Sequence, residues 1–120
     1  MTDAEVQFRI RFAASLRAVE ACDAFGKSQH DGTFENLVRR VRDLQRSCGT
    51  AFSTVEEVAT LVDDIADSRT LQRDADTVTI TKLRARLFDL HKAIGRRGDH
   101  FPESRNEILK TAHGTLPTAE

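Results

Sequence analysis

Apolar residues recur at alternating spacings of three and four along the middle of this chain, for more than four heptads. The series is Phe34, Leu37, Val41, Leu44, Cys48, Ala51, Val55, Val58, Val62 and Ile65. This spacing places the apolar side chains on one face of an α-helix, whereas a half-buried strand would alternate at every second residue. The middle of the chain is therefore expected to be helical and to pack one face against other helices.

The same segment permits either one long helix or two shorter ones. A single helix over residues 33–70 would be roughly 57 Å long at 1.5 Å per residue. Gly49 stands where a helix would stop, and overlapping capping boxes at Ser53-Thr-Val-Glu56 and Thr54-Val-Glu-Glu57 would start another. A stop signal beside a start signal favours a break between residues 49 and 53.

Further helix signals lie on both sides of this segment. A first helix is expected over residues 3–25, with Thr2 or Asp3 as its N-cap and Gly26 as its stop. A later helix is expected to begin after Asp74 or Asp76 and to run to residue 95 or 98, because apolar residues again recur at spacings of three and four. Residues 77–81 alternate like a strand but have no second strand to pair with, so they are expected to start this helix.

The terminal segment completes the expected fold. Pro102 predicts the start of a short helix that ends before Gly114, and residues 115–120 are expected to form a flexible tail. Short connections between helices of similar length are typical of antiparallel packing. The sequence therefore predicts an all-α protein, an antiparallel four-helix bundle with a short C-terminal fifth helix, in a single domain over residues 1–114.

Charge and composition narrow the function classes. The formal net charge of −1 gives no global attraction to nucleic acid or to an anionic membrane. The sequence has no signal-like or membrane-spanning apolar run, so we expect a cytoplasmic protein with no membrane contact and with Cys22 and Cys48 reduced. No Glu-x-x-His pair of the kind that holds metals in helical bundles occurs, and we expect no metal and no cofactor.

The first helix carries two apolar rows rather than one. Phe8 and Phe12 begin one row, and Val6 and Ile10 begin the other. Because both rows cannot face a small core, these four residues are expected to form an interaction surface for a protein partner or for self-association as a homodimer. The leading interpretation is a small protein-interaction or regulatory module that acts without catalysis.

His91 is the residue on which an alternative function would depend. It is expected on the rim of the apolar face formed by Leu87, Leu90 and Ile94. The run His91-Lys-Ala-Ile-Gly95 resembles histidine phosphotransfer domains, in which a rim histidine is followed four residues later by a small residue. That resemblance implies a phosphoryl-accepting His91, with phosphate stabilised by Lys92 or Arg84 because Ile94 stands where the family has a lysine.

Two nucleic-acid alternatives rest on the arginines. Arg86 and His91 are similar to the Arg-x4-His motif of HEPN-type ribonucleases, although on an ideal helix Arg84 lies about 20° from His91 and Arg86 about 140°. A basic patch for a nucleic-acid backbone is the other alternative. Its candidates are Arg39, Arg40, Arg42, Arg46, Arg84, Arg96 and Arg97. No aromatic residue lies among them to stack on bases, so nucleic-acid binding is the weaker expectation.

Overall fold

The computed structural model describes residues 2–114, and these residues form helices connected by short loops, with no strand among them. The helices are α1 (Asp3–Lys27), α2 (Asp31–Cys48), α3 (Thr54–Thr70), α4 (Thr77–Arg97), the short 3-10 helix η1 (Gly98–His100) and α5 (Pro102–Gly114). The all-α prediction is confirmed. The predicted tail over residues 115–120 lies outside the described residues.

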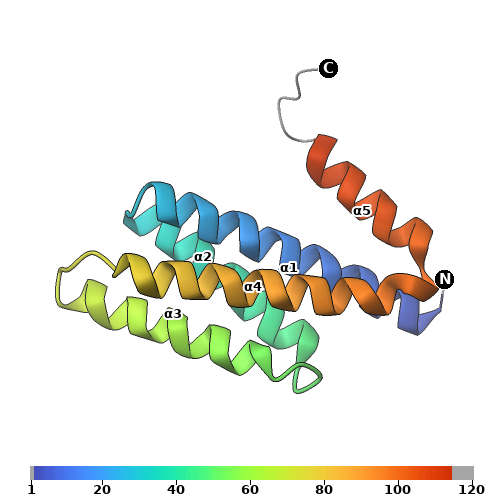
Figure 1. Cartoon of the computed structure of the whole chain (residues 1–120), viewed down its shortest axis with the longest axis horizontal. Helices are drawn as coiled ribbons and strands as arrows, with labels where there is room; N and C mark the ends of the chain where they lie inside the picture. Colours follow the sequence, from blue (N-terminus) through green and yellow to red (C-terminus); the bar gives the residue numbers. More distant parts are fainter. Residues whose placement is uncertain (1, 115–120) are drawn as a thin grey trace.

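The first four helices form an antiparallel bundle (Figure 1). Helix α1 packs against α2 and α4, and α3 packs against the same two helices from the opposite side. The predicted four-helix arrangement is therefore the observed one. Its centre is made mainly of branched aliphatic side chains with no exposed surface. They include Leu37, Leu44, Val58, Leu83, Leu87 and Leu90. Full burial of each leucine contributes about 1.5–3 kcal/mol.

The heptad segment is two helices, as the adjacent stop and start signals predict. Helix α2 ends at Cys48, and Gly49 adopts a φ of 54°, which is the left-handed region that favours glycine. The expected capping box at Ser53 does not form, because the Ser53 side chain makes no cap hydrogen bond. Phe52 stabilises the loop instead, with the guanidinium carbon of Arg97 4.5 Å and that of Arg11 6.0 Å from its ring centroid.

The first connection differs from the expectation at Gly26. Helix α1 continues through Gly26 to Lys27, and the N–H of Ser28 still donates to the carbonyl of Ala24. The next helix is capped by His30, whose Nδ1 accepts from the N–H groups of Gly32 and Thr33. Gly26 is therefore not the stop that the sequence predicts, because the turn is made by residues 28–30 and needs no residue with positive φ.

The starts of α1 and α4 agree with the cap signals, whereas α5 includes Gly114 and does not end before it as predicted. Thr2 caps α1 by accepting from the N–H of Glu5, and Asp76 caps α4 by accepting from the N–H of Val78. Residues 77–81 are the first turn of α4 and not a strand. Within the part of the chain that the structure describes, none of the helices is both long and apolar enough to cross a membrane.

Helix α5 leaves the bundle at the end where α1 begins (Figure 1). Its first turn contacts α1 through Ser104, which is 2% exposed. The Ser104 hydroxyl donates a hydrogen bond to a Glu5 carboxylate oxygen over 2.6 Å and accepts one from the Arg9 guanidinium over 2.9 Å. Arg9 also forms an ion pair with Glu107 at 3.2 Å. The fifth helix therefore lies along the start of α1, where it forms one wall of the cavities described next.

Candidate functional site

The two apolar rows of α1 have different environments. Phe8 and Phe12 are buried at 5% and 2% exposure, because they pack inside the bundle under α4 and η1. Val6 and Ile10 remain 41% and 55% exposed. The expectation that all four residues share an exposed surface is corrected for Phe8 and Phe12, which belong to the chain's own core. Val6 and Ile10 are the exposed members of that set.

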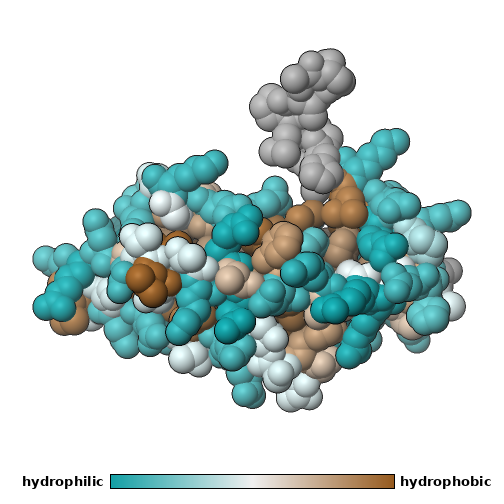
Figure 2. All heavy atoms as spheres, viewed as in Figure 1, coloured by the Kyte–Doolittle hydropathy of each residue, from teal (hydrophilic) through white to brown (hydrophobic). Residues whose placement is uncertain are grey.

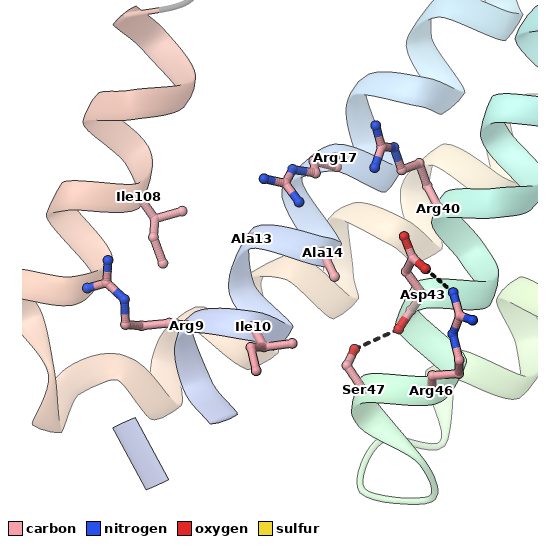
Figure 3. Close-up of a pocket in the computed structure, with 10 residues that line it drawn as sticks. All are labelled: Arg9, Ile10, Ala13, Ala14, Arg17, Arg40, Asp43, Arg46, Ser47 and Ile108. Atoms are coloured by element: carbon pink, nitrogen blue, oxygen red, sulfur yellow. Dashed lines mark hydrogen bonds and ion pairs between the residues drawn. The ribbon is translucent and has the colours of Figure 1, made fainter. Parts of the chain in front are cut away.

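Ile10 lies in a groove along α1. A cavity of about 610 Å³ opens between α1 and α2, with Ile108 of α5 at its other side (Figure 3). A second cavity of about 300 Å³ lies between α1 and α5 and shares Arg9, Ala13, Arg17 and Ile108 with the first. We call these two adjoining cavities the α1 groove. Its floor is apolar because Ala13 and Ala14 of α1 have short apolar side chains, which leave space between the flanking helices.

The rim of the α1 groove carries four arginines together with three carboxylates, of which Glu20 and Glu107 line the smaller cavity. Arg9 and Arg17 come from α1, Arg40 and Arg46 come from α2, and Asp43 is the one carboxylate in the larger cavity (Figure 3). Arg46 pairs with Asp43. Arg17 and Arg40 form no ion pair with any side chain that the structure describes. The groove therefore combines exposed apolar surface with two arginines that have no carboxylate partner in the described part of the chain.

The seven arginines of the candidate basic patch do not share one surface. Arg40 lines the α1 groove, Arg39 and Arg42 line a cavity of about 500 Å³ beside Phe34, and Arg46 lines both. On α4 the arginines separate further. Arg84 donates to Asp23 over 2.8 Å, Arg97 lies over Phe52, and Arg96 lines a cavity beside His91.

His91 is half-buried between α4 and α1. Its ring stacks on Phe12 with centroids 4.6 Å apart and an interplanar angle of 15°, and its Nδ1 lies 2.8 Å from the hydroxyl oxygen of Ser15. Ser15 is fully buried, and its hydroxyl lies 2.8 Å from the carbonyl oxygen of Phe12. Burial lowers the pKa of His91 from its ordinary value, which favours the neutral ring at pH 7.

The hydrogen bonds of Ser15 are the basis for assigning a tautomer to His91. The single hydroxyl proton of Ser15 is directed at the Phe12 carbonyl, which can only accept. The Ser15 oxygen is then free to accept, so we assign the proton of the neutral imidazole to Nδ1. Nε2 carries the lone pair and is the ring nitrogen left for an external group.

Of the two cations that the resemblance implies beside His91, Lys92 lines the same cavity and Arg84 does not. Arg84 is held by Asp23 and packs over Phe88, and Arg86 pairs with Asp89 at 3.2 Å and with Glu57 of α3 at 3.7 Å. The cavity that contains His91 is lined by Lys92 together with Arg96 and Arg105. Sequence reasoning missed Ser15 and Arg105, because neither their spacing nor their composition links residues on α1 and α5 to a histidine on α4.

Comparisons of this chain with known protein families, with curated proteins and with solved structures found no match. Within the described residues, no three His, Cys, Asp or Glu side chains come close enough to hold a metal ion. Cys22 and Cys48 are both buried, and both are free thiols. The α1 groove and the His91 cavity are therefore the two sites from which a function can be argued.

Proposed function

We propose that this protein is a protein-interaction module that binds an acidic amphipathic helix of a partner in the α1 groove. The observation that carries the proposal is the 55% exposure of Ile10 in a groove rimmed by Arg9, Arg17, Arg40 and Arg46. Isolated exposed apolar residues are ordinary, but an apolar groove beside Arg17 and Arg40, which have no carboxylate partner among the described residues, favours a helix that carries both apolar and acidic side chains.

The chemistry of the groove selects the partner. Apolar side chains at helical spacings of three and four would contact Ile10, the alanines and Ile108. Carboxylates on the flanks of such a helix would meet Arg17 and Arg40, which can each form two parallel hydrogen bonds to a carboxylate. A basic helix would face like charge at the same positions. We place this interaction in the cytoplasm, where Cys22 and Cys48 remain thiols.

The test uses a designed helical peptide of about 18 residues, with leucines on one face and glutamates on the other. We expect fluorescence anisotropy to show saturable binding to the wild-type protein, and Ile10→Glu to weaken it about tenfold or more by placing a charge in the apolar floor. Val78→Glu is the matched control, because Val78 is 69% exposed at the start of α4 and lies outside the groove.

The charge requirement is tested separately. A peptide with lysine in place of each glutamate is expected to bind far more weakly than the acidic peptide, and the double change Arg17→Glu with Arg40→Glu is expected to reverse that preference. Equal binding of both peptides to the wild-type protein, or equal effects of Ile10→Glu and Val78→Glu, would refute the proposal.

A second candidate function is phosphoryl acceptance by His91, favoured by the hydrogen bond that turns Nδ1 toward Ser15 and leaves Nε2 for an incoming group. In that reaction the Nε2 lone pair forms a P–N bond as the P–O bond of an aspartyl phosphate breaks, and the aspartate leaves as a carboxylate. Incubation with phosphorylated receiver domains tests it. We expect the phosphoryl group to be transferred to the wild-type protein and not to His91→Gln. If the wild-type protein takes up no phosphoryl group, this candidate function is excluded.

A further inference from the structure

The cavity beside His91 has a lining unlike that of four other cavities among the described residues. It has a volume of about 410 Å³, lies where α1, α4 and α5 meet, and contains no carboxylate. Its lining residues are Phe12, His91, Lys92, Gly95, Arg96, Arg105 and Leu109. The other cavities each contain at least one aspartate or glutamate, for example Asp43 or Glu107. This lining favours an anionic ligand.

The three cations of the cavity are not equally available. Arg105 is held in place, since it donates to the Gly95 carbonyl over 3.1 Å and to Asp99 over 2.9 Å. Lys92 has its ammonium 3.9 Å from Asp89. Arg96 forms no ion pair with any described side chain. Arg96 is therefore the main donor for an anion, and Lys92 is the second.

His91 places a different demand on the ligand. With the ring proton assigned to Nδ1, beside Ser15, Nε2 of His91 carries a lone pair and needs a proton donor from a ligand in the cavity. A carboxylate or a sulfate ester carries no proton near neutral pH and would set its own lone pairs against Nε2. A phosphomonoester has its second pKa near about 6, so it can supply one proton to Nε2 and acceptor oxygens to the arginine and the lysine.

We propose that this cavity binds a small phosphomonoester non-covalently, with the phosphate between Arg96, Lys92 and Nε2 of His91. The organic part of the ligand contacts the Phe12 ring and Leu109, which line the same cavity. The inference goes beyond the docking function, since the α1 groove lies on another face of α1, and it does not need a phosphoryl group to be transferred to His91.

The test compares phenyl phosphate, which has a second ionisable proton, with phenyl sulfate, which has the same phenyl group but no such proton, by NMR titration of the full chain at constant pH and ionic strength. We expect phenyl phosphate to shift the His91 ring signals saturably and phenyl sulfate to bind about tenfold more weakly, as loss of a hydrogen bond to a charged group implies. Inorganic phosphate is expected to bind more weakly than phenyl phosphate, because it lacks the apolar part.

Three variants separate the contributions. Arg96→Gln is expected to weaken phenyl phosphate binding about tenfold. Arg73→Gln removes the same charge in the exposed loop before α4 and should leave the affinity unchanged. His91→Gln should abolish the preference for phosphate over sulfate even where some binding remains. Equal affinity for the two ligands in the wild-type protein, equal effects of the two arginine variants, or no saturable shift at His91 would each overturn the proposal.

Discussion

Gly49 and Gly26 show how one residue type acts differently according to backbone conformation. Gly49 has a φ of 54°, and a Cβ added there would meet no atom within 4 Å, whereas Gly26 is helical and a Cβ there would lie 3.6 Å from an Ile80 methyl group. We expect Gly49→Ala to destabilise the protein by about 1–3 kcal/mol through backbone strain alone. Gly26→Ala should stabilise it by about 0.5–1 kcal/mol. Urea unfolding measures both, and a stabilising Gly49→Ala would contradict the observed break.

His91 links the stability of the fold to pH. Burial lowers its pKa below the ordinary value of 6.5, so the unfolded chain takes up a proton at His91 before the folded chain does. The contribution of His91 to the free energy of unfolding is therefore fully present above pH 6.5. It declines as the pH falls below 6.5 toward the lower pKa of His91 in the folded protein. We expect His91→Gln to lose less stability than the wild-type protein between pH 7 and pH 5, measured by urea unfolding. An identical loss in both proteins would show that His91 is not the group responsible.

Local signals in the sequence predict single residues well where the chemistry is local. Thr2 caps α1 and Asp76 caps α4, as their side chains and their positions before the helices predict. His30 is a cap that the sequence does not predict, because histidine is not among the preferred capping residues, although its Nδ1 accepts from two backbone N–H groups here. The partner of His91, Ser15, is 76 residues away in the chain, so no spacing rule could identify it.

The helices themselves were predictable because their apolar spacing matches the helical period. The limits of that reasoning appear in α1, which has two apolar rows, and the sequence does not say which of them is buried. Gly95 and Gly98 allow the row that contains Phe8 and Phe12 to be buried. A Cβ at Gly98 would lie 2.3 Å from the Phe8 ring, and a Cβ at Gly95 would lie 3.2 Å from the Phe12 ring. The two phenylalanines pack against the end of α4 where it lacks side chains, and Val6 and Ile10 are left outside.

The buried hydroxyl of Ser104 links α5 to two side chains of α1, Glu5 and Arg9. Ser104→Ala would leave Glu5 and Arg9 without their shared partner, and we expect a loss of about 1 kcal/mol together with faster hydrogen exchange in α5. Ser53→Ala is the matched control, because Ser53 makes no cap hydrogen bond at the start of α3, and its effect should stay within about 0.5 kcal/mol. Unchanged exchange in α5 after Ser104→Ala would show that other contacts hold this helix.

The surface of the bundle is mainly polar and has smaller apolar areas on the face shown in Figure 2. Arg86 of α4 pairs with Glu57 of α3, but an exposed ion pair of this kind contributes only about 0–1 kcal/mol. The α1 groove could not be predicted from the sequence. It depends on the angle at which α5 leaves the bundle, and no local pattern specifies that angle.

The most direct test of the docking function is to map where the acidic peptide binds, using amide chemical shifts of the isotope-labelled protein during titration. We predict that the largest shifts fall on residues 6–17 of α1 and 40–47 of α2, with smaller ones near Ile108 in α5. Shifts concentrated on α3 or on the loop over residues 71–76, or no shifts at saturating peptide, would contradict the assignment of the α1 groove as the binding site.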